Sequence, residues 1–220
     1  MDPKYPLSGF ITKVTCPNFW EGRQGYNVKA LVIHKPEGNN NVIIPYLQKS
    51  ETQKSYNFIV GLDGRVTELV SPDNAAWHSG VVVSPTWKGI IQGANPNLYT
   101  IGIALEGFAK DPETQMQLIS LYKLIADLVT RYKIDISDET IVWHREIDTG
   151  KTCPGFHINK YLTCVSADSC RQALAYALKT GIVANETNTP LTDLPGSIMP
   201  PQTEVQENNV ASSGNTESTS

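Results

Sequence analysis

The side chains best suited to chemistry in this sequence are histidines, a cysteine and a lysine. The stretch "WHREIDTGKTCPG" holds His144, Lys151 and Cys153 within ten residues, although the 220-residue chain has only four histidines and four cysteines. Another histidine, His34, follows the apolar run "ALVI" far upstream. Imidazole and thiolate are typical zinc ligands, and a catalytic zinc usually has three protein ligands and an open position for water. We therefore consider a zinc site at His34, His144 and Cys153.

Both histidines lie at the ends of predicted strands. Residues 29–35, "KALVIHK", form an apolar run with β-branched residues, and residues 140–144, "TIVWH", form a shorter one. Such runs predict buried strands, and a strand end holds a side chain on a rigid frame at the edge of a sheet. Taken singly, a strand-end histidine is more often a hydrogen-bonded residue than a ligand. A lone cysteine is more often a small buried hydrophobe, so the spacing alone is a weak signal.

The rest of the chain mixes predicted strands with predicted helices. Strand predictions rest on β-rich runs around turn residues such as "LDG", and helix predictions rest on apolar residues at helical spacing. The helix at 111–133 begins with Asp and Pro and has Glu113 in its first turn. Strands are expected at 55–70, as a hairpin, and at 99–107, and helices at 111–133, at 169–181 and from near Asn41 to 51–56. This pattern predicts an α/β domain with a central mixed β-sheet flanked by helices.

Composition places the chain among ordinary globular proteins. Hydrophobic residues make up 40% and charged residues 18%, and the formal net charge of -4 argues against a nucleic-acid partner. No apolar run has the length of a membrane span, and no secretory signal is recognisable. We expect a catalytic domain at 1–183 and a disordered polar tail at 184–220, which is rich in Asn, Thr, Ser, Pro and Glu. Cys164 and Cys170 are close enough in sequence to pair locally, but a reducing compartment argues against it.

Several blocks of the chain, in order, resemble one family. They are "NFWEGRQGYNVKALVIHK", "SYNFIVGLDGRVTELV", "AAWHSG", "NLYTIGIALEG" and "WHREIDTGKTCPG". Together they cover roughly residues 8–165 and resemble the zinc-dependent N-acetylmuramoyl-L-alanine amidases of the second type. This family includes phage lysozyme-like amidases, cytoplasmic anhydromuropeptide amidases and peptidoglycan recognition proteins.

The resemblance implies roles for individual residues. It places zinc ligands at His34, His144 and Cys153, and it matches Lys151 to a lysine that stabilises the oxyanion. It matches Tyr56 to a tyrosine that faces the metal in catalytic members, whereas the residue alone reads as a strand tyrosine packed on the sheet.

One position departs from the family pattern. Many relatives have a glutamate base in the block written here "IGIALEG", where this chain has Ala104. Glu106 lies two residues on, so strand alternation would keep it on the same face. It is a candidate substitute for the missing base, or a structural residue at the strand end, and it ranks below Tyr56 and Lys151.

The block "AAWHSG" is expected at the rim of a substrate groove. Trp77 and His78 are therefore candidates for contact with the peptide stem or the glycan. The alternative for His78 is a loop histidine whose ring is satisfied by backbone groups. Asp148 is an alternative metal ligand whose place in the motif does not fit, and His157 is read as structural.

The implied reaction is hydrolysis of the amide between N-acetylmuramic acid and the L-alanine of the stem peptide, with bacterial peptidoglycan as partner. We expect a monomeric phage endolysin that stays in the host cytoplasm until lysis. A cytoplasmic muropeptide-recycling amidase is the alternative within the same chemistry. Two further hypotheses are a peptidoglycan-binding module without catalysis and a cysteine hydrolase that uses Cys153 with His144.

Overall fold

The computed structural model describes residues 11–137 and 139–155. In chain order, the elements are β1 (Ile11–Lys13), β2 (Phe19–Trp20), β3 (Ala30–His34), α1 (Asn40–Leu47), the 3₁₀ helix η2 (Ser50–Thr52), β4 (Phe58–Val60), β5 (Val66–Glu68), β6 (Ala75–Ala76), the 3₁₀ helix η3 (Pro96–Leu98), β7 (Thr100–Leu105), α2 (Gln115–Tyr132), β8 (Ile141–Trp143) and α3 (His144–Ile147).

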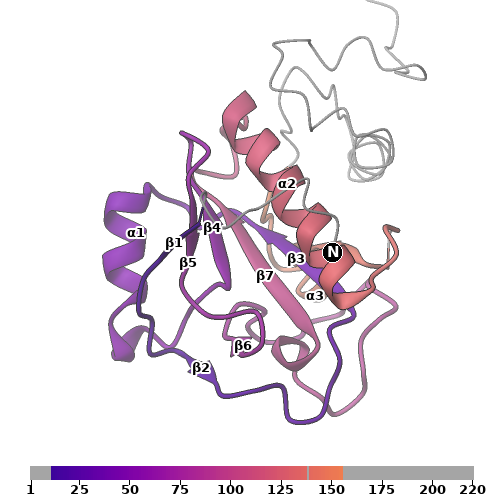
Figure 1. The fold of residues 1–220 in the computed structure, drawn as a ribbon. Coiled ribbons are helices and arrows are strands. Elements are labelled where there is room, and N and C mark those ends of the chain that lie inside the picture. Colours follow the sequence, from indigo (N-terminus) through magenta and orange to yellow (C-terminus); the bar gives the residue numbers. More distant parts are fainter. Residues whose placement is uncertain (1–10, 138, 156–220) are drawn as a thin grey trace, which may run out of the picture.

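A six-stranded mixed sheet forms the centre of the fold, in the order β1-β5-β4-β7-β3-β8 (Figure 1). Strand β3 is parallel to both of its neighbours, β7 and β8, whereas β4 and β5 form the predicted antiparallel hairpin. All residues of β3 are buried, as expected for a parallel strand covered on both faces. The predicted fold class, a mixed sheet flanked by helices, is confirmed.

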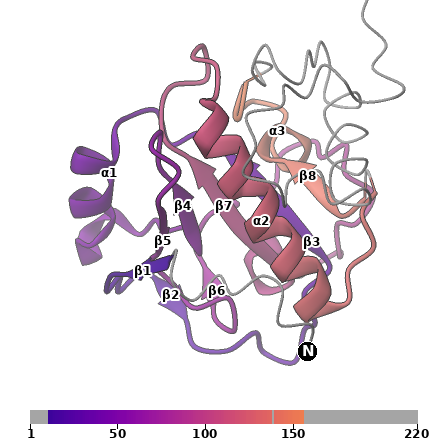
Figure 2. The same ribbon diagram turned by 45° about the horizontal axis from the view of Figure 1, so that its top comes forward.

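Helix α2 covers one face of this sheet. Figure 1 and Figure 2 both show it crossing β7 and β3. Leu118, Leu121 and Leu128 of α2 pack in one buried cluster with Ile33 and Ile101 of the strands. The helix begins a few residues later than predicted because the hydroxyl of Thr114 caps it, accepting the backbone N–H of Gln117 at 3.1 Å.

The opposite face of the sheet carries smaller side chains. Alternation along β7 turns Thr100, Gly102 and Ala104 to this face, away from α2, while Val32 and His34 of β3 point the same way. A second buried cluster, around Val32, and a third, around Ala104, cover it. The small residues of β7 leave space above the sheet, and the candidate site is built in this space.

The helix predicted from near Asn41 to 51–56 is shorter than expected. Helix α1 ends at Leu47, and η2 follows as a separate turn. The amide of Asn18 donates to the carbonyl oxygens of Leu47 and Lys49, both at 2.9 Å, and so satisfies carbonyls that a longer helix would have used. The end of α1 is thus set by a residue far away in sequence, and a local sequence pattern does not reveal such a contact.

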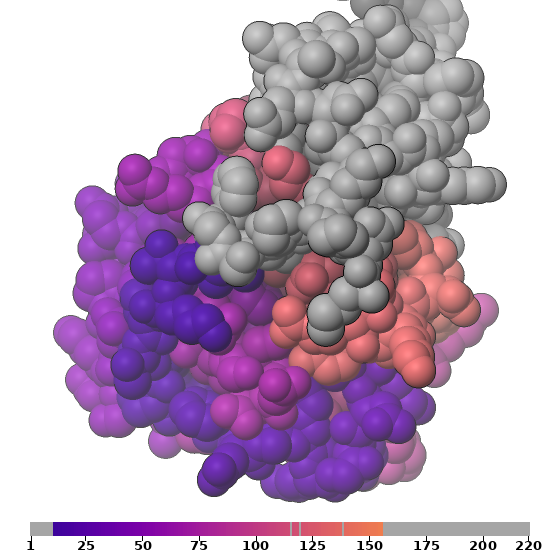
Figure 3. All heavy atoms as spheres, viewed as in Figure 1, coloured from indigo at the N-terminus to yellow at the C-terminus, as the bar shows by residue number. Residues whose placement is uncertain are grey.

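Some predictions concern residues outside the described part of the chain. They are the helix at 169–181, the tail at 184–220, the pairing of Cys164 with Cys170, and the structural role of His157. Within the described ranges, no helix combines the length and the apolar character that crossing a membrane requires. In the space-filling view, the segment after α2, coloured salmon to orange, reaches the surface beside purple residues from the N-terminal half (Figure 3).

Candidate metal centre

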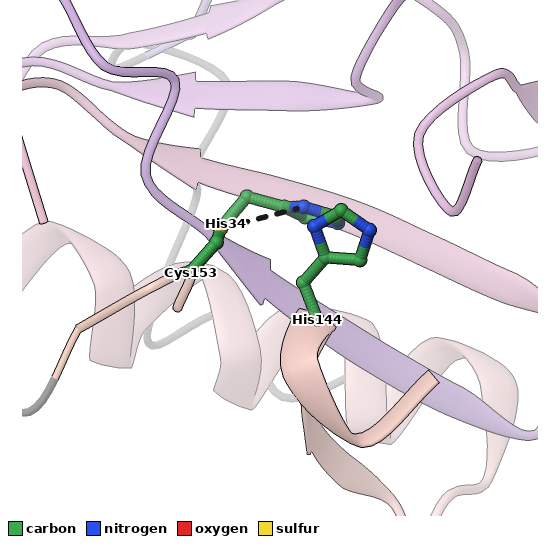
Figure 4. Close-up of side chains that lie close together, drawn as sticks. All are labelled: His34, His144 and Cys153. Atoms are coloured by element: carbon green, nitrogen blue, oxygen red, sulfur yellow. Dashed lines mark hydrogen bonds between the residues drawn. The ribbon is translucent and has the colours of Figure 1, made fainter. Parts of the chain in front are cut away.

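Three potential ligands come together where β3 and β8 end. His34, His144 and Cys153 each offer one ligand atom, and these atoms all lie within 4.8 Å of one another. Figure 4 shows the three side chains converging from the end of β3, the start of α3 and the loop that follows α3. The Sγ atom of Cys153 lies 4.0 Å from Nδ1 of His34. The predicted triad is thus assembled although its first member lies more than a hundred residues from the others.

The strand register brings the two histidines together. Ile33 of β3 is paired with Trp143 of β8, so the next residues, His34 and His144, leave neighbouring parallel strands at the same level. Adjacent strands lie about 4.8 Å apart, and the two imidazole rings have centroids 4.5 Å apart. Helix α3 begins at His144 itself, with the Glu146 carboxylate accepting the backbone N–H of Trp143 at 2.6 Å.

The loop after α3 returns Cys153 to the end of β3. The carbonyl of Cys153 accepts the backbone N–H of Arg145 at 3.1 Å, which folds this loop against α3. The backbone N–H of Lys35 donates to Sγ of Cys153 at 3.1 Å. A donor placed this way stabilises a thiolate, which is the form of cysteine that binds metal. Gly155 packs so closely on the Ala109 carbonyl that a Cβ would lie 2.1 Å from its oxygen, so a larger residue there would displace the loop.

A buried ion pair, which was not predicted from the sequence, involves the residue that follows His34. Lys35 follows the last residue of β3, and its side chain reaches the segment that precedes α2. Its Nζ lies 3.2 Å from Oε1 of Glu113, with the two side chains 0% and 2% exposed, and it donates to the Asp111 carbonyl at 2.9 Å. Glu113 therefore neutralises Lys35 instead of sitting in the first turn of the helix. The signal in the sequence was a lysine at the end of an apolar strand run.

His78 lies beneath the metal centre. Its side chain is buried, and Nδ1 lies 3.1 Å from Nε2 of His34. On the other side of the ring, Nε2 lies 3.2 Å from the hydroxyl of Thr100. The ring rests on Gly102, where a Cβ would lie 2.5 Å from Cγ of His78. The absence of a side chain at Gly102 lets this ring lie against the sheet, where it is buried. Contact between His78 and substrate stays a prediction.

Burial determines the protonation of the site. It lowers the pKa of His34 well below the ordinary value, with further lowering from His144 and His78, and it lowers the pKa of His78 to about 3. Burial also lowers the pKa of His144. All three imidazoles are therefore neutral near pH 7, as metal ligation requires. Burial raises the pKa of the Cys153 thiol to about 11, so ionisation of this thiol needs a nearby cation.

The donor set fits zinc. A tetrahedral ion with zinc–nitrogen and zinc–sulfur bonds of ordinary length separates its ligand atoms by roughly 3.3–3.7 Å. The 4.0 Å between Sγ of Cys153 and Nδ1 of His34 needs only a small contraction to reach that range. Two neutral imidazoles and one thiol leave a fourth position for solvent or substrate, as in catalytic rather than structural sites.

Comparison with known proteins identifies the family. The sequence pattern of the N-acetylmuramoyl-L-alanine amidases matches residues 24–156, more than half of the chain, and this range includes every residue of the triad. The chain belongs to the N-acetylmuramoyl-L-alanine amidase family, as the sequence resemblance predicted.

Two relatives show how far the likeness extends. The 1,6-anhydro-N-acetylmuramyl-L-alanine amidase AmpD of Haemophilus influenzae is 31% identical over 131 residues, which is 56% of this chain and 65% of the relative. The chain thus spans slightly less than two thirds of that curated relative. The crystal structure of a selenomethionine derivative of AmpD is 23% identical, with a TM-score of 0.57, and the match covers 81% of this chain and 98% of the other. At that identity the structural match supports the amidase fold alone.

The residues predicted to handle protons and to stabilise the oxyanion occupy different surroundings. The ring of Tyr56 lies 5.0 Å from that of His34, centroid to centroid, and is partly buried. Burial and the nearby Cys153 and Glu37 raise the pKa of its phenol, so the phenol stays protonated and is able to donate. The side chain of Lys151 is 55% exposed, with Nζ 4.0 Å from a carboxylate oxygen of Asp148. Lys151 is thus only loosely held.

Both carboxylate oxygens of Glu106 accept backbone hydrogen bonds. One carboxylate oxygen accepts the backbone N–H of Asn40 at 2.7 Å and the other accepts that of Leu62 at 2.8 Å. These bonds tie the start of α1 to the turn between β4 and β5. Strand β7 ends at Leu105, so strand alternation does not determine where the side chain of Glu106 points.

Trp77 is the other residue predicted to contact substrate. It is partly exposed, and its indole lies against that of Trp20, with ring centroids 5.7 Å apart. Its backbone N–H donates to the hydroxyl of Ser55 at 2.8 Å, which fixes the start of the segment that carries His78.

Proposed function

We propose that the protein hydrolyses the amide bond between N-acetylmuramic acid and L-alanine in peptidoglycan fragments, with zinc as cofactor. The observation that carries this proposal is the convergence of His34, His144 and Cys153 within a chain of the amidase family. The fourth ligand position and the neutral imidazoles are what a hydrolytic site needs. The proposal makes peptidoglycan material the partner of this protein.

The residues around the triad have separate tasks in this proposal. When bound, zinc supplies Lewis acidity at the scissile carbonyl and lowers the pKa of a water molecule. The ammonium of Lys151 provides positive charge where the tetrahedral intermediate develops negative charge. The protonated phenol of Tyr56, beside His34, donates a hydrogen bond or a proton to the reacting groups. Trp77, beside Trp20, offers an aromatic surface to the sugar or the peptide.

The substrate is proposed to be a soluble 1,6-anhydro muropeptide rather than the intact cell wall. Support comes from the Haemophilus influenzae relative, which is named for the 1,6-anhydro form of the sugar. This favours the recycling alternative over the endolysin predicted from the sequence, which remains unconfirmed. Under the recycling proposal the protein acts where such soluble fragments accumulate.

A digest with two substrates tests activity and substrate together. Purified sacculi and a 1,6-anhydro muropeptide are each incubated with the protein, with chelator, and with chelator followed by Zn²⁺, and the products are identified by mass. We expect free stem peptide from the muropeptide, lost with chelator and restored by Zn²⁺. Release from sacculi at a comparable rate would favour the endolysin instead. Binding without release would support the non-catalytic module, and chelator-insensitive release would support the cysteine hydrolase.

Replacing Lys151 with alanine tests the oxyanion role. We expect Lys151→Ala to lower turnover about a hundredfold, as loss of an oxyanion donor typically does, while zinc content stays unchanged. Lys151→Arg keeps the charge and recovers part of the rate, and Lys49→Ala, at an exposed lysine beyond the end of α1, serves as the matched control. Steady-state kinetics on the muropeptide provide the measurement. Full activity in Lys151→Ala would remove this residue from the mechanism.

A further inference from the structure

We propose that the dipeptide His78–Ser79 is the positioning element that leaves Nδ1, on both His34 and His144, free to bind the metal. The proposal rests on the proposed zinc site but concerns a different question, namely which ring nitrogen is the ligand. A chain of hydrogen bonds that begins at the carbonyl of Pro96, which can only accept, fixes the donor and acceptor roles of these rings.

The hydroxyl of Thr100 determines which nitrogen of His78 carries the hydrogen. Its Oγ1 lies 2.7 Å from the carbonyl oxygen of Pro96, which can only accept, so the single hydroxyl hydrogen is used there. The same Oγ1 lies 3.2 Å from Nε2 of His78. With its hydrogen already given, the hydroxyl must act as acceptor, and Nε2 of His78 must carry a hydrogen.

The imidazole of His78 passes this constraint to His34. A neutral imidazole has one N–H, so Nδ1 of His78 is an acceptor. It lies 3.1 Å from Nε2 of His34, which must therefore carry the hydrogen of that ring. The lone pair of His34 is left on Nδ1, the nitrogen that lies 4.0 Å from Sγ of Cys153.

Ser79 determines the tautomer of the second histidine ligand, His144, by a direct hydrogen bond. Its carbonyl oxygen lies 3.2 Å from Nε2 of His144. A carbonyl only accepts, so Nε2 of His144 carries the hydrogen and Nδ1 keeps the lone pair. Hydrogen bonds of this kind, from the nitrogen that does not bind the metal, orient ligand histidines and fix their tautomer.

The dipeptide is held as a unit against the sheet. The side-chain oxygen of Asn97 accepts the backbone N–H groups of both His78, at 3.1 Å, and Ser79, at 2.9 Å. The absent side chain at Gly102 makes room for the His78 ring, as described above. Together, one asparagine and one glycine place two acceptors beside two ligands, one at the end of β3 and one at the start of α3.

The tautomer is measured first, on the unmodified full chain without metal. Long-range ¹H–¹⁵N NMR correlations distinguish the two neutral forms of each histidine. We expect His34, His78 and His144 all to be protonated at Nε2. Protonation of His34 or His144 at Nδ1 would overturn the proposal, and this result depends on no variant.

Variants then test whether the relay matters for zinc. In His78→Leu, which cannot accept from His34, zinc affinity measured by competition with a chromophoric chelator should fall about 10–100-fold, as for other losses of such partners. In His78→Asn the side-chain oxygen replaces the Nδ1 acceptor, and affinity should recover to within a few-fold. Thr100→Val, which removes the fixed acceptor, should mix the tautomers of His78, whereas Thr100→Ser should not.

The outcomes separate this proposal from the proposed function. If the unmodified protein binds no zinc, the proposed zinc site itself is wrong. Unmodified protein that binds zinc, with His78→Leu folded and binding it equally well, would overturn only the positioning role. Equal losses in His78→Leu and His78→Asn would also overturn that role, because simple packing would then explain both.

Discussion

Replacing Cys153 with serine removes zinc from the protein and lowers amide hydrolysis by at least about a thousandfold, because the Lewis acid contributes several kcal/mol. Serine is a poor zinc ligand, and the buried site offers no other thiol within the described residues, where the remaining cysteine, Cys16, belongs to a different buried cluster. Zinc content by elemental analysis and turnover on the muropeptide are measured on the same sample. Unchanged zinc and unchanged turnover would contradict the assignment.

Two controls accompany this variant. Cys16→Ser keeps a donor for the Leu47 carbonyl, which Cys16 reaches at 3.2 Å, and should leave zinc content and turnover intact. Cys153→Asp supplies a carboxylate, which also binds zinc, and should retain measurable metal and activity. A thiol nucleophile would not survive that exchange, so activity in Cys153→Asp excludes the cysteine hydrolase.

Replacing Glu113 with glutamine should destabilise the protein by about 3–5 kcal/mol, because it leaves the buried ammonium of Lys35 without its anionic partner. The effect is measured by urea unfolding of the metal-free protein. Zinc affinity provides a second readout, since the backbone N–H of Lys35 donates to Sγ of Cys153. A free energy of unfolding within about 1 kcal/mol of the unmodified protein would show that the pair does not hold the strand end in place.

A second ion pair, on α2, provides the matched control. The side chains of Arg131 and Asp127 are 52% and 33% exposed, and Nη2 of Arg131 lies 3.1 Å from Oδ2 of Asp127. Asp127→Asn should change the free energy of unfolding by no more than about 0.5 kcal/mol, because exposed pairs of this kind contribute little. The double variant Lys35→Met with Glu113→Leu should recover much of the loss, since apolar residues can replace a buried pair.

Local pattern and family resemblance together were enough to predict the triad and the core strands. His34 and His144 each follow an apolar run, and parallel strands in register bring such ends together. Cys153 was found through its place in the closing motif. The choice among Lys151, Tyr56 and Glu106 as proton-handling or oxyanion groups depended on the family resemblance. The structure shows that both carboxylate oxygens of Glu106 accept backbone N–H groups.

The parts that could not be predicted depend on contacts between distant segments. The burial of His78 requires Gly102 beneath it, and the pairing of Lys35 with Glu113 requires the chain before α2 to cross the end of β3. Similarly, Asn18 ends α1 from outside. Each contact joins residues at least 24 positions apart in the printed sequence, so no periodicity or spacing rule detects it.

The most direct test of the account is X-ray absorption at the zinc edge of the unmodified full chain. We expect one sulfur at about 2.3 Å and nitrogen ligands at about 2.0–2.1 Å, as for a site with two imidazoles and one thiolate. The sulfur contribution should vanish in Cys153→Asp while zinc remains bound. A spectrum of the unmodified protein without sulfur, or a protein that retains no zinc, would contradict the assignment of His34, His144 and Cys153 as the metal ligands.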